Sequence, residues 1–285
     1  YLLQSCEDMT RVFREAFYIA NSGRPGPVLI DVPSDLAGSE MVFEYPEDVH
    51  IPSYKPTVKG NARQIRQAVE MMKNAKRPIF YIGGGIIASH SEEELRSVVE
   101  ALQIPVVTTL MAKSAFPSSH PLNLGHVGMH GSKFANYAVT NADLLVAVGA
   151  RFSDRVTGKL ADFAPEAKVI HVDVDPAEIG KNRIPQIPIV GDAKVVLAGM
   201  KEQLDKGGFE PQTKEWLEQI EQWRSRHPFY SPGLVALNGS ISPEGSLDLL
   251  SRMLDPYNSI VTTEVGQHQM WATQTTCLSG HATFA

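Results

Sequence analysis

Asp143-Leu-Leu-Val-Ala-Val-Gly149 predicts a buried strand that runs directly into the charged turn Ala150-Arg-Phe-Ser-Asp-Arg-Val-Thr-Gly158. A second predicted strand, Lys168-Val-Ile-His-Val-Asp173, is followed by Asp175-Pro-Ala-Glu-Ile-Gly-Lys-Asn182, and a third ends at Val190-Gly-Asp192. In open α/β sheets, ligands bind beyond the carboxyl ends of the strands. The stretch from Asp143 to Asp192 therefore predicts a site for a nucleotide-like cofactor.

The pattern around this stretch predicts an α/β fold with a doubly wound parallel sheet. Helices and strands alternate from residue 61 to about residue 204. Helices are expected over 61–75, after a capping box at Ser91-Glu-Glu-Glu94 and from Asp192, and strands over 78–82 and 105–110. A later helix carries Trp216, Ile220 and Trp223 at helical spacing, which favours packing over a binding role.

The flanking segments predict two incomplete domains. Residues 1–38 hold a helix over 8–21, ended by Gly23, and a buried strand over 27–33. Residues 39–60 form a linker, 61–206 the central domain and 207–240 a second linker with a helix. Residues 241–285 open a further domain with a helix starting at Ser242-Pro243, lined by Leu247, Leu250 and Leu254, and a strand over 259–265.

Composition excludes several classes of protein. Of the 285 residues, 43% are hydrophobic and 20% charged, as in an ordinary globular protein, and the net charge of −6 argues against nucleic acid as a partner. No apolar run is long enough to span a membrane, and no targeting segment is evident. Cys6 and Cys277 are far apart, which argues against a disulfide framework or a zinc site.

Several groups at predicted strand ends suit a cofactor with phosphates and ribose hydroxyls. Gly83-Gly-Gly85, Thr108-Thr-Leu110, Gly149-Ala-Arg151 and Asp173 would bring backbone amides, a guanidinium and carboxylates together. The alternative is a surface ion-pair network of Arg151, Asp154 and Arg155, and the residues leave both interpretations open.

Two other segments carry polar groups in loops. Gly125-His-Val-Gly-Met-His-Gly131 is a loop rather than a metal site, because its glycines argue against a helix and it has no acidic third ligand. Gly266-Gln-His-Gln-Met-Trp271 places donors at a helix N-terminus, which suits an anion. An ordinary polar helix start, with Met270 and Trp271 packed inward, is slightly favoured by local physics.

Four motifs together resemble a known family. Ser22-Gly-Arg-Pro-Gly-Pro-Val-Leu-Ile-Asp-Val-Pro33 resembles the end of the pyrimidine-binding domain of thiamine-diphosphate enzymes. Residues 151–159, 175–182 and 265–271, in this order, are similar to the catalytic subunits of the acetolactate synthase (acetohydroxyacid synthase) family. The resemblance extends to about Thr273, and Gln274 to Ala285 do not follow the family, so no role is assigned to them.

The resemblance implies the tail of a pyrimidine-binding domain, a Rossmann-like FAD-binding central domain and the start of a diphosphate-binding domain. It implies that Asp154 and Arg155 lie near the substrate channel, and that thiamine diphosphate contacts Val265, Gly266, Gln267, His268 and Met270. It implies FAD contacts, in which the flavin is not a redox carrier, at Arg24, Gly84, Thr109, Leu110, Val127, Gly128, Met129, His130, Gly149, Ala150, Arg151, Phe152, Asp173, Val174, Asp192 and Ala193.

The family chemistry decarboxylates pyruvate and joins the remaining two-carbon unit to a second pyruvate or to 2-ketobutyrate, the first common step of branched-chain amino-acid biosynthesis. The family's catalytic Glu would lie upstream of Tyr1 and its magnesium ligands beyond Ala285, so we expect this segment alone to fold but not to catalyse. A homodimer or larger assembly, a small regulatory subunit, and a cytoplasmic or organellar location are also implied. Alternatives are glyoxylate carboligase, pyruvate oxidase or a non-catalytic nucleotide-binding module.

Overall fold

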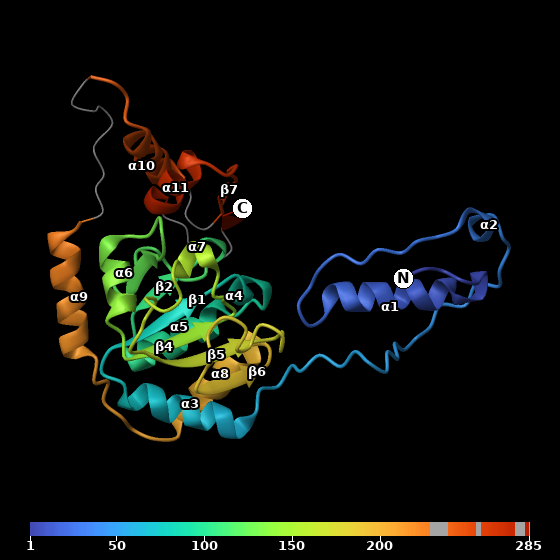
Figure 1. The fold of residues 1–285 in the computed structure, drawn as a ribbon, viewed down its shortest axis with the longest axis horizontal. Coiled ribbons are helices and arrows are strands. Elements are labelled where there is room, and N and C mark those ends of the chain that lie inside the picture. Colours follow the sequence, from blue (N-terminus) through green and yellow to red (C-terminus); the bar gives the residue numbers. More distant parts are fainter. Residues whose placement is uncertain (229–238, 255–257, 277–282, 285) are drawn as a thin grey trace. The chain divides into compact units, whose positions relative to one another are not determined.

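The computed structural model describes residues 1–228, 239–254, 258–276 and 283–284. The chain forms two compact units, Tyr1–Val58 and Lys59–Ala285 (Figure 1). Cys277 lies outside the described residues. No helix among the described residues is long and apolar enough to cross a membrane.

The first unit is built around one amphipathic helix. It contains the 3-10 helix η1 (Cys6–Asp8), α1 (Met9–Asn21) and the short α2 (Ser34–Ala37). The predicted helix is confirmed, and Gly23 follows it in the left-handed conformation (φ +60°). The predicted buried strand over 27–33 is wrong: only the parallel bridge Leu2–Asp31 forms, and Leu29 is 81% exposed. No second strand within this unit is present to supply the ladder that a buried strand needs.

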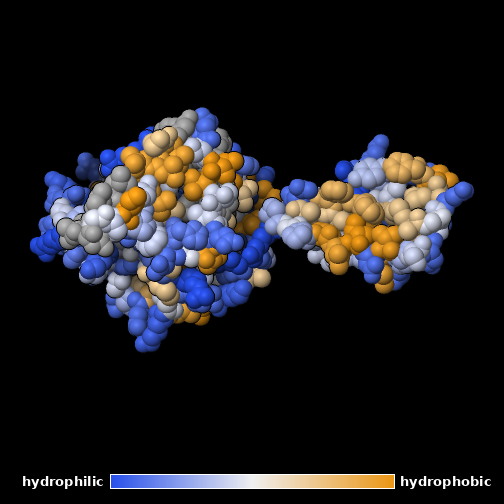
Figure 2. Space-filling model, turned by 90° about the horizontal axis from the view of Figure 1, so that it is seen from above, coloured by the Kyte–Doolittle hydropathy of each residue, from blue (hydrophilic) through white to orange (hydrophobic). Residues whose placement is uncertain are grey.

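Apolar side chains remain on the surface of this unit. Figure 2 shows them as orange surface over the smaller body of the molecule. Leu2 and Phe17 are about 60% exposed, and Val42 and Phe43 more than 70%. Residues 39–58 contain neither helix nor strand. So few elements cannot enclose these side chains, because one helix offers only one face to bury them.

The second unit contains a six-stranded parallel sheet, which confirms the predicted α/β class. The strand order is β3-β2-β1-β4-β5-β6, so the chain builds outward from β1 to one edge and then from β4 to the other. Polar and glycine residues follow most strands at their carboxyl ends. The strands are β1 (Pro78–Ile82), β2 (Val106–Thr108), β3 (Asn123–His126), β4 (Leu144–Val148), β5 (Lys168–Asp173) and β6 (Ile187–Val190).

Helices cover both faces of the sheet. On one face, α3 (Ala62–Asn74), α5 (Glu92–Leu102) and α8 (Ala193–Asp205) bury their apolar stripes against Phe80 and Ile82. On the other, α6 (Lys133–Thr140) and α9 (Lys214–Arg226) pack with Ile79 and Tyr81. Successive residues of β1 thus enter opposite cores, as the two-residue period of a strand requires. Short pieces α4 (Gly85–Ala88), η2 (Leu110–Ala112) and α7 (Asp154–Thr157) follow strand ends.

The aromatic stripe of α9 packs as predicted. Trp216 is 3% exposed, and its indole N–H donates to the Pro78 carbonyl at 3.2 Å. Trp223 meets it edge to face at 5.6 Å between ring centroids. Burying both indoles against the sheet accounts for this spacing, so the stripe is a packing feature.

The capping box predicted at Ser91 does not form. Ser91 is fully buried, and its hydroxyl donates to the Ile86 carbonyl at 3.3 Å instead of capping α5. At Ser242 the prediction is correct, since its Oγ accepts from the Gly245 N–H at 3.0 Å at the start of α10 (Pro243–Met253). Leu250 of α10 is 48% exposed, so the predicted leucine face is only partly buried.

The C-terminal elements are short. The strand predicted over 259–265 is reduced to β7 (Ile260–Val261), which pairs in parallel with β8 (Thr283–Phe284). Between them, α11 (Gln267–Thr275) begins directly after Gly266. Leu247 of α10 packs with Ala272 of α11, which joins the two helices.

The loop after β1 and the loop after β4 cross each other with their backbones in direct contact. A Cβ on Gly83 would lie 2.2 Å from the Gly149 carbonyl oxygen, and one on Gly85 would lie 2.5 Å from the Gly149 Cα. Gly149 has a left-handed φ of +56°. The crossing is held by hydrogen bonds from the Gly83 N–H to the Val148 carbonyl and from the Gly85 N–H to the Gly149 carbonyl, at 3.1 and 3.0 Å. Only glycine lets the two backbones pack this closely.

Two histidines, one buried and one half-buried, lack full hydrogen bonding among the described residues. His171 on β5 is 1% exposed, and neither of its ring nitrogens has a partner among the described residues. Burial lowers the pKa of His171. At the end of β3, burial, and next the nearby charge of Lys113, lower the pKa of His126 from 6.5 to about 4. Both imidazoles are therefore neutral in the folded protein at neutral pH.

We expect Gly83→Ala to lower the free energy of unfolding by about 1–3 kcal/mol, because the methyl group must displace the backbone at Gly149. Gly207→Ala is the matched control, since a Cβ there meets nothing within 4 Å. Urea unfolding followed by circular dichroism measures both variants. Equal midpoints for the two would contradict the crossing as a structural requirement.

We expect stability to fall as the pH drops through the window between 6.5 and about 4, in which unfolded His126 binds a proton and folded His126 does not. The cost is at most about 1.4 kcal/mol per pH unit for this group. His171 acts in the same sense, whereas burial raises the pKa of Asp173 and works against it. The free energy of unfolding should change less with pH across this range in His126→Gln than in the unsubstituted protein. The control is His90→Asn, at an exposed histidine, which should behave like the unsubstituted protein. Identical slopes would show that His126 does not contribute.

Candidate functional site

The carboxyl edge of the sheet gathers the residues predicted to hold a cofactor. All six strands are parallel, so their carboxyl ends share one edge. The ladder continues past the strand ends: the Thr109 N–H donates to the Ile82 carbonyl at 2.9 Å, and the Val127 N–H to the Thr108 carbonyl at 3.3 Å. The central-domain residues singled out from sequence follow β1, β2, β3, β4, β5 and β6 at this edge.

The glycine turn has a different role from the one its sequence suggested. At Gly83 and Gly85, the backbone at Gly149 occupies the space where a side chain would stand, so no room remains there for a ligand. At Gly84 the nearest atom to an added Cβ is the Met111 Cβ, at 3.1 Å, and Met111 is 63% exposed. Of the three glycines, Gly84 is the one whose backbone can face a bound group.

The loop after β3 is fixed by a residue that the sequence did not reveal. Asn136 of α6 accepts from the Gly128 N–H and donates to the Gly128 carbonyl, both at 3.0 Å. Gly128 has φ +110°, and a Cβ there would lie 2.8 Å from the Val156 Cα. The Met129 N–H donates to the Arg155 carbonyl at 3.3 Å. The loop after β3 and the turn after β4 are thus pressed together, with Met129 66% exposed at the surface.

The charged turn after β4 is held through its carbonyls. The Tyr81 hydroxyl donates to the Arg151 carbonyl at 2.9 Å, and the Asn182 amide donates to the Phe152 carbonyl at 2.8 Å. These bonds leave the side chains of Arg151, Asp154 and Arg155 exposed.

The ion-pair network considered from sequence does not form among the described residues. Asp154 instead accepts from the Ser153 hydroxyl and the Arg155 N–H, at 3.2 and 2.9 Å. The salt bridges of the described residues include none between Arg151, Asp154 and Arg155. Their charged ends are therefore not committed to one another.

Arg183 holds the segment that follows this turn, residues 163–167, by hydrogen bonds to its backbone. Its guanidinium donates to the carbonyls of Phe163, Ala164 and Ala167 at 2.8–3.2 Å. Ala164 is held there with a left-handed φ of +48°. One planar donor group satisfies three backbone acceptors, a geometry that suits arginine.

Two carboxylates lie at the ends of β5 and β6. Burial raises the pKa of Asp173, while the Asp175 N–H donates to its carboxylate at 2.9 Å and opposes that effect. Asp192 caps α8 by accepting from the Val195 N–H at 3.2 Å. The helix N-terminus and the carboxylates provide amide donors beside acceptors for hydroxyl groups.

Four of the predicted contact residues have buried apolar side chains. Val127, Ala150, Phe152 and Ala193 are each at most 7% exposed. Phe152 packs against His171 and Tyr81 at 5.3 and 5.6 Å between ring centroids. These residues could reach a cofactor only through their backbone. Arg24 belongs to the other unit, Tyr1–Val58.

The segment Gly266 to Trp271 is a helix N-terminus, as predicted, with Gly266 directly before α11. Gln267 and His268 are exposed in the first turn of α11, and Val265 before them is 92% exposed. The Gln269 amide donates to the Thr263 hydroxyl at 3.2 Å, while Met270 and Trp271 are half-buried. The first turn is thus open to a ligand on the side of Gln267 and His268.

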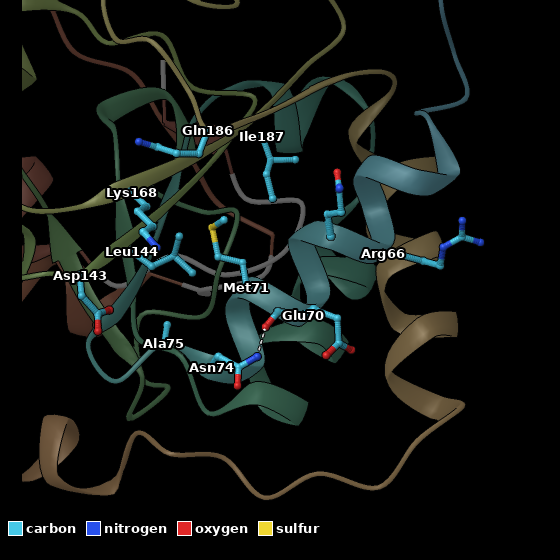
Figure 3. Close-up of a pocket in the computed structure, with 11 residues that line it drawn as sticks. Arg66, Glu70, Met71, Asn74, Ala75, Asp143, Leu144, Lys168, Gln186 and Ile187 are labelled. Atoms are coloured by element: carbon cyan, nitrogen blue, oxygen red, sulfur yellow. Dashed lines mark hydrogen bonds between the residues drawn. The ribbon is translucent and has the colours of Figure 1, made fainter.

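A pocket of about 780 Å³ lies at the opposite edge of the sheet. Figure 3 shows its lining from α3 and from the amino ends of β4, β5 and β6, with Met71 and Leu144 near its centre. Asp143 at its rim accepts the backbone N–H groups of Lys76 and Arg77 at 2.9 and 3.0 Å. This pocket shares no residue with the groups gathered at the carboxyl edge.

Comparison with known proteins identifies the family of this fold. Residues 65–200 match the family described as "Thiamine pyrophosphate enzyme, central domain". The chain is 47% identical over 278 residues to the acetolactate synthase large subunit IlvB1 of Mycobacterium tuberculosis. It is 44% identical over 276 residues to that of Corynebacterium glutamicum and 46% over 281 residues to that of Pyropia yezoensis.

These matches cover 96% of this chain but only 44–46% of the relatives, so the chain spans less than half of their length. The matched region 65–200 contains β1 to β6, and with them the strand ends described above. Residues 65–200 therefore belong to the thiamine pyrophosphate enzyme family, and the three relatives named above are acetolactate synthase large subunits.

Proposed function

We propose that the protein containing this chain is an acetolactate synthase. It decarboxylates pyruvate and joins the remaining two-carbon unit to a second 2-keto acid, giving 2-acetolactate or 2-aceto-2-hydroxybutyrate. The observation that carries the proposal is the similarity to acetolactate synthase large subunits along 96% of the chain. The product places it in branched-chain amino-acid biosynthesis.

The carboxyl edge of the central domain is proposed as a Rossmann-like FAD site. The backbone at Gly84, the exposed Arg151 and the carboxylate of Asp173 supply the amide donors, guanidinium and acceptor that a dinucleotide with ribose or ribityl hydroxyls needs. Thr109, Leu110, Val174, Asp192 and the loop Val127 to His130 complete the proposed contacts. Among the described residues, Arg151 forms no salt bridge with Asp154, so its guanidinium is available to a ligand, which supports this assignment. The flavin is proposed to be structural and not a redox carrier.

The segment Val265 to Met270 is proposed as a thiamine diphosphate contact. The exposed Gln267 and His268, at the start of α11, fit a polar ring and its phosphate arm. Bound thiamine diphosphate supplies the carbanion-stabilising chemistry of the decarboxylation. Asp154 and Arg155, exposed after β4, are proposed to lie near the substrate channel.

The proposed magnesium ion does not fit the described residues. Among them, no group of three or more His, Cys, Asp or Glu side chains is arranged to hold a metal.

A homodimer or larger assembly and a small regulatory subunit are proposed, the latter because the relatives are named large subunits. The proposed location is the cytoplasm in bacteria or an organelle in eukaryotes.

The function is tested on the complete gene product that contains this sequence. With pyruvate, thiamine diphosphate, Mg²⁺ and FAD, we expect acetolactate to form, detected as acetoin after acid decarboxylation. The purified protein should show a flavin absorbance band that NAD does not displace. Oxidation of pyruvate coupled to flavin reduction, with no acetolactate, would instead identify a pyruvate oxidase.

We expect Asn136→Asp to weaken FAD binding by about 5–20-fold, because it removes the amide donor that holds the Gly128 carbonyl in the proposed flavin loop. Asn141→Asp is the matched control, since Asn141 ends the same helix and, in the part of the chain that the structure describes, its side-chain amide donates only to the Tyr137 carbonyl. Titration followed by quenching of flavin fluorescence measures both. Equal affinities would remove Asn136 from the site.

A further inference from the structure

Helix α11 contacts two of the segments proposed to hold FAD. The Gln274 side-chain amide donates to the His130 carbonyl at 2.8 Å, in the loop after β3. Two residues earlier, Ala272, which is 2% exposed, packs against Leu110 in the turn after β2. These contacts come from residues 140 positions or more away along the sequence, and Figure 1 shows α11 beside this part of the second unit.

The same helix begins with the proposed thiamine diphosphate residues. Gln267 and His268 form its first turn, and Gln274 lies seven residues after Gln267, which is about 10 Å along the axis. Within the helix, the Thr273 hydroxyl donates to the Gln269 carbonyl at 2.7 Å and the Thr276 hydroxyl to the Ala272 carbonyl at 2.6 Å. A movement of the first turn of α11, at Gln267 and His268, therefore also moves the part of the helix that carries Gln274.

The loop that receives Gln274 has little freedom to move independently. Asn136 holds both backbone groups of Gly128, and the Gly131 N–H donates to the Gly128 carbonyl at 3.0 Å. A Cβ on Gly131 would lie 2.5 Å from the His126 carbonyl oxygen. A hydrogen bond to His130 thus connects α11 to a loop whose residues are bonded to one another and to Asn136, so that the loop shifts or becomes ordered as one unit.

We propose that Gln274 is a positioning residue that couples the binding of FAD to the binding of thiamine diphosphate. The proposal rests on the proposed function, which places the two cofactors at the loop after β3 and at the start of α11. When one cofactor fixes its segment, the Gln274–His130 bond and the Ala272–Leu110 contact fix the other, so the second cofactor pays less to order its site. The coupling is reciprocal, as linkage requires.

The test measures the FAD dissociation constant of the complete gene product with and without saturating thiamine diphosphate and Mg²⁺, by quenching of flavin fluorescence. We expect thiamine diphosphate to tighten FAD binding by about 5-fold or more. Gln274→Glu and Gln274→Met, which lack the amide donor, should bring this ratio to about 1. Gln274→Lys keeps a donor of sufficient reach and should retain the coupling.

Thr275→Val is the matched control on the same helix turn, because among the described residues its hydroxyl donates only to the Trp271 carbonyl within α11; its ratio should equal that of the unsubstituted protein. The proposal is overturned if Gln274→Glu and Gln274→Met weaken FAD binding equally in the presence and absence of thiamine diphosphate, which is the effect of a merely structural residue. Binding of both cofactors without coupling in the unsubstituted protein overturns this inference alone. Failure to bind either cofactor overturns the proposed function as well.

Discussion

The approach of the loop after β4 to the loop after β1 is the constraint on which the rest of the second unit depends. Gly83 and Gly85 contact Gly149 at distances that no side chain allows. This crossing occurs between the two central strands, where the chain changes the direction in which it builds the sheet. It therefore fixes the backbone close to Gly84 and Arg151, which lie one and two residues from the contacting glycines.

The edge built on this crossing is supported by polar side chains that act on backbone groups. Tyr81, Asn136, Asn182 and Arg183 all bind carbonyls of the loops rather than other side chains. Buried backbone groups must be paired, and loops cannot pair with one another as strands do. As a result, the side chains of the turn after β4 stay exposed and available, while its backbone is fixed.

Much of this arrangement could be predicted from the sequence, because it depends on local patterns. Apolar runs ending in Gly, Asp or Arg located β1, β4 and β5 and placed their loops at one edge, and the Trp216 and Trp223 spacing predicted packing. Asn136 could not be found, since its partner Gly128 lies in another element and no spacing rule connects them. The predicted strand over 27–33 was wrong because its apolar run has no ladder partner within its unit. How far the leucine face of α10 is buried could not be predicted, because helical periodicity does not say whether a neighbour covers that face. The three-glycine turn was located correctly, but two of its glycines serve the packing of backbone on backbone, which a single sequence does not distinguish from space for a ligand.

Arg183 gives the segment after the charged turn the equivalent of a cross-link. Three carbonyls within five residues converge on one guanidinium, which closes a loop that a disulfide would close in a secreted protein. Unlike a disulfide, this closure survives a reducing environment. The left-handed turn at Ala164 is therefore maintained independently of redox state.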